Sequence, residues 1–208
     1  CTPTRYGLLT GRYAWRTSMK KGVLKGYSPL MVGLLGRSTI ASMLHDRGYT
    51  TAAIGKWHLG LGDRKVTDYS EPLSPGPNDL GFDYFFGIPA SLDMPPYTFV
   101  ENTTTLAPFE GQMAKESARR RLGGDGYWHA GPVATGFDHN DVLPQITKRS
   151  EQYIHDVKKS GSDKPFFLYL PLPAPHTPWL PTEEFRGKSQ AGHYGDFVTQ
   201  VDASVGRI

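Results

Sequence analysis

Cys1 is the only cysteine of the 208-residue chain, and the residues that follow it could hold a reactive side chain. Pro3 favours the first turn of a helix, where its missing N–H group is not needed. The free N–H groups and the positive dipole end of such a helix would point back at Cys1 and favour an anion there. Arg5 adds a permanent positive charge about one turn further on. Two interpretations of Cys1 are therefore open: a nucleophilic or modified residue, and a small buried apolar side chain.

Lys56 and His58 come directly after a segment that predicts a strand. Residues 50–54 are short and largely apolar, and they follow a predicted helix that Gly48 ends, as in one half of an α/β unit. Open α/β sheets bind their ligands just beyond the carboxyl ends of their strands. Lys56 and His58 would share a face there if the extended geometry continues. The simpler alternative is a surface lysine and a buried histidine with ordinary hydrogen-bond partners.

His176 repeats this arrangement later in the chain. Residues 165–170 combine aromatic and aliphatic side chains without alternation, which predicts a buried strand, and His176 stands in the proline-rich segment that follows. The prolines restrict the backbone, so we expect His176 to be held in place. Ser91 likewise follows an aromatic segment, residues 81–89, which predicts a short strand or turn. Taken alone, Ser91 is equally consistent with a serine that caps a turn.

Three segments resemble, in the same order, the motifs of the type I sulfatases. Residues 1–5 match C-x-P-x-R and are extended by T-G-R at 10–12, residues 55–60 read G-K-W-H-L-G, and residues 173–178 read P-A-P-H-T-P. The extension to T-G-R makes the first match much more specific than C-x-P-x-R alone. The resemblance covers nearly the whole chain, and it implies an α/β fold, the alkaline-phosphatase-like α/β/α sandwich with a mostly parallel central sheet.

The resemblance also implies roles for individual residues. In that family the cysteine, here Cys1, is oxidised after translation to the aldehyde formylglycine by a formylglycine-generating maturation enzyme. Lys56 then corresponds to the lysine that contacts both the sulfate and the formylglycine. The catalytic set carried over to this sequence is Cys1, Arg5, Lys56, His58 and His176: Arg5 and His58 hold the hydrated formylglycine, and His176 binds sulfate and protonates the leaving oxygen. A further polar residue of the family binds sulfate, and Ser91 occupies that position.

The family's metal ion is usually Ca²⁺, with Mg²⁺ as the alternative. Its ligands in the family are two adjacent aspartates before the cysteine and an Asp-Asn pair after a later strand, all oxygen donors. Neither pair occurs in this sequence, so Cys1, as formylglycine, is the one metal ligand that the resemblance assigns here. We therefore expect residues 1–208 to be the central part of a single catalytic domain, incomplete at both ends. Alone, these residues are expected to bind metal poorly and to be inactive.

The implied activity is that of an arylsulfatase-like sulfuric ester hydrolase, which releases sulfate from an aryl or carbohydrate sulfate ester. Such enzymes usually act outside the cytoplasm, which suggests the periplasm, the cell exterior or the lysosome. Two alternatives are open: a phosphonate or phosphodiester hydrolase of the same superfamily, and a non-catalytic sulfatase-like binding protein. Comparing the hydrolysis of aryl sulfates and aryl phosphodiesters distinguishes a sulfatase from the first alternative. Whether Cys1 is formylglycine or an unmodified thiol distinguishes an active enzyme from the second.

Composition excludes other classes of protein. The formal net charge of +3 is too small to indicate a nucleic-acid partner. No apolar run approaches the roughly 18 residues of a membrane span, so we expect no membrane-spanning segment. A basic run at residues 119–121 is consistent with a solvated loop or with a contact to an anionic substrate.

The elements that must position these residues can also be predicted from sequence periodicity and from glycine and proline positions. The last of the predicted helices is amphipathic and is expected to cover one face of the sheet, with His193 and Asp196 in structural roles. Helices are expected at 3–11, from about 38 to Gly48, at 142–159 and at 192–208. Strands are expected at 50–54, 165–170 and, as a strand or turn, 81–89, with loops at 12–38, 61–80 and 93–140.

Overall fold

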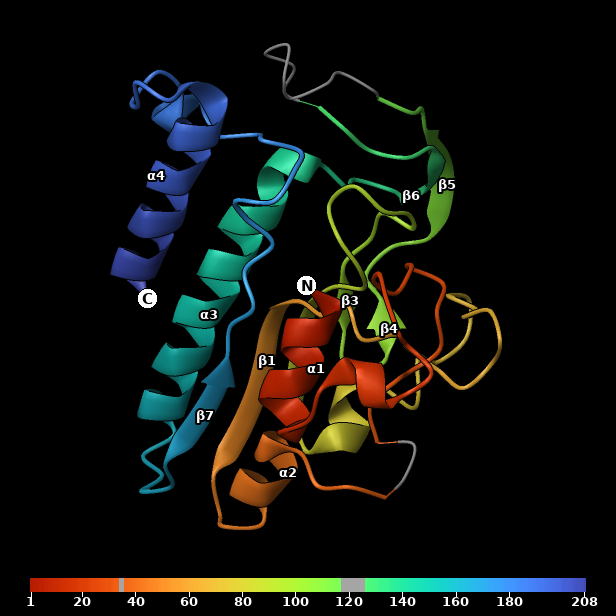
Figure 1. Cartoon of the computed structure of the whole chain (residues 1–208). Coiled ribbons are helices and arrows are strands. Elements are labelled where there is room, and N and C mark those ends of the chain that lie inside the picture. The colour runs from red at the N-terminus through yellow and green to blue at the C-terminus, as the bar shows by residue number, and fades with distance from the viewer. Residues whose placement is uncertain (34–35, 117–125) are drawn as a thin grey trace.

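The computed structural model describes residues 1–33, 36–116 and 126–208, so the basic run at 119–121 lies outside the described residues. In the described part, a five-stranded sheet carries α-helices, and a smaller two-stranded sheet stands beside it (Figure 1). The α-helices are α1 (Thr2–Thr10), α2 (Ile40–His45), α3 (Val142–Lys159) and α4 (Gly192–Arg207). Short 3-10 turns are η1 (Ala14–Arg16), η2 (Pro77–Leu80), η4 (His139–Asp141) and η5 (Glu183–Phe185).

The three longest strands of the main sheet run parallel to one another. The sheet order is β4-β3-β2-β1-β7, and β1 pairs in parallel with β2 on one side and with β7 on the other. The bounds are β1 (Thr50–Lys56), β2 (Tyr84–Ile88), β3 (Val100–Glu101), β4 (Thr104–Thr105) and β7 (Phe166–Tyr169). The antiparallel pairs are confined to the short β3 and β4. The predicted α/β class with a mostly parallel sheet is confirmed.

Alternating side chains of β1 separate two apolar layers. Ala53 belongs to a cluster with Tyr6 and Leu9 of α1. Ile54, its neighbour, belongs to a second cluster with Val142 and other α3 residues. Successive strand residues point to opposite faces of a sheet, so α1 and α3 cover opposite faces (Figure 1). This is the expected α/β/α layering.

The last helix and the last strand differ from their predictions. We expected α4 to cover a sheet face, but it packs against α3 instead, and its Phe197 reaches the apolar layer between α3 and the sheet (Figure 1). We expected β7 to be buried, but the side chain of Phe166 is exposed. Among the described strands, β7 pairs only with β1, so it is an edge strand. Periodicity identified both elements but could not identify their neighbours.

Residues 93–140, predicted as irregular, contain four short strands in the described part. Besides β3 and β4, these are β5 (Phe109–Met113) and β6 (Gly131–Ala134), which form the separate antiparallel sheet. The prediction was wrong because two-residue strands are too short for an alternation pattern. β5 has a register shift near its start and β6 contains a proline, which further hides the pattern.

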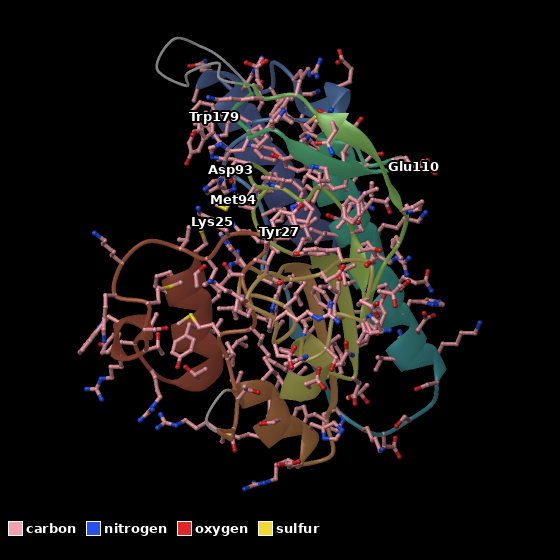
Figure 2. The ribbon with its side chains drawn as sticks, turned by 90° about the vertical axis from the view of Figure 1, so that its right-hand side faces the viewer. Lys25, Tyr27, Asp93, Met94, Glu110 and Trp179 are labelled. Carbon is pink, nitrogen blue, oxygen red and sulfur yellow. The ribbon has the colours of Figure 1, made fainter. Side chains whose placement is uncertain are left out.

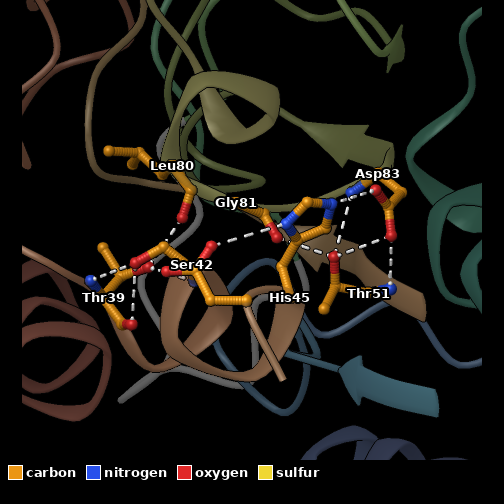
Figure 3. Close-up of polar contacts among 8 residues, drawn as sticks. Thr39, Ser42, His45, Thr51, Leu80, Gly81 and Asp83 are labelled. Atoms are coloured by element: carbon orange, nitrogen blue, oxygen red, sulfur yellow. Dashed lines mark hydrogen bonds and ion pairs between the residues drawn. The ribbon is translucent and has the colours of Figure 1, made fainter. Parts of the chain in front are cut away.

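A polar network fixes the start of β1 against α2 (Figure 3). Thr39 and Ser42 form a capping box at the start of α2, and the Thr39 hydroxyl also donates to the carbonyl of Leu80 at 2.6 Å. At the start of β1, the Thr51 amide donates to Asp83 at 2.8 Å and its hydroxyl donates to the Gly81 carbonyl at 2.6 Å. These bonds fix the position of β1 along the sheet. They therefore also fix where Lys56 and His58 lie at its carboxyl end.

The contact between β1 and β2 requires glycine at position 87. A Cβ atom at Gly87 would lie 1.7 Å from the carbonyl oxygen of Gly55, its partner in the parallel pair. We expect Gly87→Ala to lower the free energy of unfolding by about 3 kcal/mol, because the backbones must separate. Gly206→Ala is the matched control: its Cβ would meet no atom within 4 Å, so helix propensity should stabilise it slightly. Urea titrations of both variants test this, and equal stabilities would contradict it.

Candidate active site

Cys1 is exposed and precedes α1 as its N-cap residue. The buried-apolar interpretation of Cys1 is therefore wrong. Its side chain makes no capping hydrogen bond, and Pro3 stands in the first turn of α1 as expected. Thr2, the next residue, is fully buried and donates its hydroxyl to the His58 carbonyl at 2.9 Å. Thr2 thereby ties the helix N-terminus to the segment that follows β1, so Cys1 stands beside that segment.

Arg5 connects the same helix to the ends of two strands. Its guanidinium donates to the carbonyl of Lys56 at 2.7 Å and to that of Leu172 at 3.4 Å. Burial lowers the pKa of Arg5, and a hydrogen bond with Tyr169 opposes that shift. Since an arginine stays charged in any accessible pH range, Arg5 supplies a fixed positive charge here. The structure places it next to Lys56, with its two terminal nitrogens directed to backbone carbonyls and its buried Nε without a hydrogen-bond partner among the described residues.

Lys56 is the last residue of β1 and is buried, with 2% of its surface exposed. Its ammonium donates to the Ser91 hydroxyl at 2.9 Å. The pKa of Lys56 is lowered to about 7, mainly by burial and then by the charge of Arg5, while the charge of Asp93 acts in the opposite direction. An anion placed beside Lys56 would restore the cationic form, because an opposite charge favours it. The site is therefore suited to an anionic ligand.

Ser91 links Lys56 to His176. The Ser91 hydroxyl lies 3.4 Å from Nδ1 of His176, which follows β7 as predicted. The same nitrogen lies 2.8 Å from the Thr177 carbonyl, which can only accept, so Nδ1 carries a proton. Lys56, Ser91 and His176 thus form one chain of contacts from three elements at the carboxyl end of the sheet. Ser91 is therefore more than a turn cap, because its hydroxyl contacts both Lys56 and His176.

His58 is held in an unusual backbone conformation next to the site. Its φ of 56° lies in the left-handed region, which residues other than glycine rarely adopt and which functional sites often contain. Its Nε2 lies 2.8 Å from the Leu24 carbonyl, and its buried Nδ1 has no hydrogen-bond partner within the described ranges. Burial, followed by the charge of Lys56, lowers the pKa of His58 to about 3. His58 is therefore neutral near pH 7, and its Nδ1 is left as an acceptor for a hydroxyl group.

The described residues do not provide a complete metal site. Ca²⁺ takes six to eight oxygen ligands, mostly from carboxylates. Residues 1–33, 36–116 and 126–208 contain no group of three or more His, Cys, Asp or Glu side chains that could hold a metal ion. Cys1 would add one ligand after conversion to formylglycine.

Sequence reasoning missed Asp93 and Thr2. Asp93 lies in the same loop as Ser91, and its Oδ1 is 3.9 Å from Nδ1 of His176. A carboxylate two residues after a predicted sulfate ligand was the available signal. Thr2 occupies a variable position of C-x-P-x-R, so no motif marks it.

None of the described helices is long and apolar enough to span a membrane.

Known proteins are similar to this chain along its whole length. The family model described as Sulfatase matches residues 1–208. The chain is 32% identical to an N-acetylgalactosamine-6-O-sulfatase of Bacteroides thetaiotaomicron, covering 100% of this chain and 45% of that protein. It is also 32% identical to human arylsulfatase A, covering 100% of this chain and 38% of that protein. The chain thus spans less than half the length of these curated relatives.

Solved structures show the same fold. One, from work on the metabolism of multiple glycosaminoglycans by Bacteroides thetaiotaomicron, has a TM-score of 0.82 at 31% identity and covers 99% of this chain and 48% of its own. A sulfatase from a Pseudoalteromonas species has a TM-score of 0.68 at 21% identity, covers 99% of this chain and 40% of its own, and supports the fold alone. The family model matches every residue, and a relative that is 32% identical aligns with the whole of this chain. The chain therefore belongs to the sulfatase family.

Proposed function

We propose that this chain carries the catalytic centre of a sulfuric ester hydrolase that releases sulfate from a carbohydrate or aryl sulfate ester. The observation that supports this most is the chain of contacts from Lys56 through Ser91 to His176. It places a buried ammonium, a hydroxyl and an imidazole at the carboxyl end of a parallel sheet, the usual ligand position of such sheets. These groups match the charge and the oxygen acceptors of a sulfate group.

The nucleophile in this proposal derives from Cys1 by oxidation to formylglycine, which a separate maturation enzyme carries out. Hydrated formylglycine supplies two geminal hydroxyl groups: one attacks sulfur, and the other allows the sulfated intermediate to collapse to the aldehyde and expel sulfate. The position of Cys1 at the start of α1, beside the segment that follows β1, supports this role.

The remaining site residues act on the substrate and on the attacking hydroxyl. Nδ1 of His58 accepts a hydrogen bond from a hydroxyl of the hydrate, which orients it. Lys56 and Ser91 donate to sulfate oxygens and stabilise charge that develops there. His176 gives its Nε2 proton to the departing oxygen as the sulfur–oxygen ester bond breaks. Arg5 holds the backbone of Lys56 and adds positive charge.

We propose that residues 1–208 are the central part of a single catalytic domain. Ca²⁺, or Mg²⁺ as the alternative, would take its other ligands from residues outside this chain. We expect the 208 residues alone to bind Ca²⁺ weakly and to turn over no sulfate ester, because the two pairs of metal ligands typical of the family do not occur in this sequence. By family analogy, the protein acts in the periplasm, outside the cell or in the lysosome.

Two measurements test the proposal on the protein that contains this chain, purified from a host with the maturation enzyme. Mass spectrometry of the Cys1 peptide should give the mass of formylglycine. Hydrolysis of 4-nitrophenyl sulfate should exceed that of bis(4-nitrophenyl) phosphate in kcat/KM. An unmodified thiol would favour a non-catalytic relative, and the reverse rate order would favour a phosphodiester hydrolase.

A further inference from the structure

Thr2 is the buried residue next to Cys1, and the proposed reaction gives it no role. Its hydroxyl donates to the His58 carbonyl at 2.9 Å and accepts from the Leu24 amide at 3.2 Å. One hydroxyl therefore joins two segments that are far apart along the chain. The first is the segment that follows β1, and the second is residues 24–27, in the loop after α1.

The same two segments meet a second time, through the imidazole of His58. Its Nε2 lies 2.8 Å from the Leu24 carbonyl oxygen. Because a carbonyl oxygen can only accept, Nε2 carries the proton. Thr2, Leu24 and His58 thus close a ring of three hydrogen bonds. In this ring the Thr2 hydroxyl holds the backbone at both ends of the imidazole contact.

The ring leaves the other imidazole nitrogen of His58 available. Nδ1 is buried and has no hydrogen-bond partner within the described ranges. In a neutral imidazole with its proton on Nε2, Nδ1 is an acceptor. A buried acceptor without a partner is uncommon in native proteins and calls for an explanation. In the proposed reaction the missing partner is a hydroxyl of the hydrated formylglycine made from Cys1.

The backbone of His58 also needs support from its surroundings. Its φ of 56° is a conformation that a residue other than glycine keeps only when neighbouring contacts hold it. The His58 amide donates to the Pro89 carbonyl at 3.0 Å. The bond from Thr2 holds the His58 carbonyl, on the other side of the same residue. Thr2 therefore supplies the contact that the amide bond alone cannot provide.

Residues 24–27 are packed independently of Thr2. A Cβ atom at Gly26 would clash with the carbonyl oxygen of Pro95, so this segment lies directly against the loop that follows β2. Figure 2 shows this approach, with Lys25 of the segment close to Met94 of the loop. Loss of the Thr2 hydroxyl should therefore release the peptide group at Leu24 without displacing the segment as a whole.

We propose that Thr2 is a positioning residue: its hydroxyl holds His58 as the tautomer with the proton on Nε2, so that Nδ1 accepts a hydrogen bond from the nucleophile that forms at Cys1. This inference rests on the proposed function. The hydroxyl is needed rather than the volume of the side chain. Valine has the shape of threonine, but it can neither accept from the Leu24 amide nor donate to the His58 carbonyl.

The first test compares Thr2→Val and Thr2→Ser in the protein that contains this chain. Thr2→Val should lower kcat for 4-nitrophenyl sulfate by about 10- to 10²-fold and change KM by less than about 3-fold, because a misoriented nucleophile affects the chemical step. Thr2→Ser keeps the hydroxyl and should recover most of the rate. Since Thr2 lies within C-x-P-x-R, mass spectrometry measures the fraction of Cys1 converted to formylglycine, and kcat is divided by that fraction.

Thr39→Val is the matched control, because it removes the same kind of hydroxyl from the network at the start of β1 (Figure 3). Thr39 is buried, and its hydroxyl donates to the Leu80 carbonyl at 2.6 Å and accepts from the Ser42 amide at 3.0 Å. Both valine variants should lower the urea midpoint, but only Thr2→Val should lower kcat. An equal loss of kcat in Thr39→Val would overturn the inference, because general destabilisation would then explain both results.

A second measurement does not depend on turnover. In protein labelled with ¹⁵N-histidine, the ring signals of His58 are assigned by their absence in His58→Gln, and their ¹⁵N shifts report which nitrogen carries the proton. Wild type and Thr2→Ser should show one tautomer, protonated at Nε2, and Thr2→Val should show a mixture of both.

Two results would overturn the inference while leaving the sulfatase proposal intact. One is the wild-type tautomer of His58 in Thr2→Val. The other is a loss of kcat in Thr2→Ser as large as in Thr2→Val. A wild-type protein without aryl sulfatase activity would contradict the proposed function instead, and the histidine signals would still decide whether Thr2 holds the tautomer.

Discussion

Cys1→Ala is expected to lower kcat/KM for 4-nitrophenyl sulfate by about 10⁴-fold or more in the protein that contains this chain. Alanine cannot be oxidised to an aldehyde, so no hydroxyl nucleophile can form at the start of α1. The rest of the site would remain, since the Cys1 side chain is exposed and makes no capping hydrogen bond. Residual rate would come from binding of sulfate by Lys56, Ser91 and His176 alone.

Stability separates a chemical defect from a folding defect in this variant. Substitution of an exposed side chain without partners usually changes the free energy of unfolding by less than about 0.5 kcal/mol, so the urea midpoint should stay at the wild-type value. Thr4→Ala is the matched control, because Thr4 is exposed on the same helical turn and has no assigned role. The prediction is contradicted if Cys1→Ala keeps more than a small fraction of wild-type turnover, or if Thr4→Ala loses as much.

Lys56→Met is expected to change activity and stability in opposite directions. Loss of the ammonium that faces the sulfate should lower kcat/KM by about 10²–10³-fold, the usual effect of removing one preorganised donor. Methionine fills a similar volume without a charge, and removal of a poorly compensated buried charge stabilises proteins by roughly 1–3 kcal/mol. The lost hydrogen bond to Ser91 offsets part of that gain. Steady-state kinetics and urea titration at pH 6 measure the two effects.

The stability gain expected for Lys56→Met depends on pH in a defined direction. The pKa of Lys56 is about 7 in the folded protein and is lowered from 10.5 by burial first. Between these values the unfolded chain holds a proton that the folded chain lacks, so wild-type stability rises with pH in this window. The advantage of Lys56→Met should therefore be largest below pH 7 and shrink toward pH 10. Lys148→Met, on the exposed side of α3, should show no such trend. A stability difference independent of pH would refute the buried-charge explanation.

Local sequence was sufficient where a pattern repeats over enough residues. The α3 stripe predicted residues 142–159, and the structure gives Val142–Lys159. A helix was predicted from about residue 38 to Gly48, and α2 spans Ile40–His45 behind the capping box of Thr39 and Ser42. The prediction of β1 was two residues short because the glycine at position 55 hides the continuation of the strand. The pattern failed in residues 93–140, where strands of two to five residues carry too few side chains to show a period.

The residues that could do chemistry were also identified from sequence, because their types and their positions after strands are local properties. Lys56, Ser91 and His176 were each predicted separately, and the fold brings them into one chain of contacts. Their roles in a reaction stay predictions, and Lys56→Met tests the role of Lys56. What sequence could not provide was the distance between them, since β1, the loop after β2 and the loop after β7 are far apart along the chain.

Only the tertiary structure decided the electrostatics of this site. The lowered pKa values of Lys56 and His58 arise from burial, and burial depends on how α1, the sheet and the loops pack. The position of Asp93 beside His176 has the same origin, because no periodicity or motif reports a 3.9 Å approach between residues from separate loops. The sequence by itself determined the family, the parallel strands β1, β2 and β7, and most of the candidate groups. Packing determined which of those groups are charged, which are neutral and which face one another, because solvent exclusion and Coulomb interactions depend on distances in space.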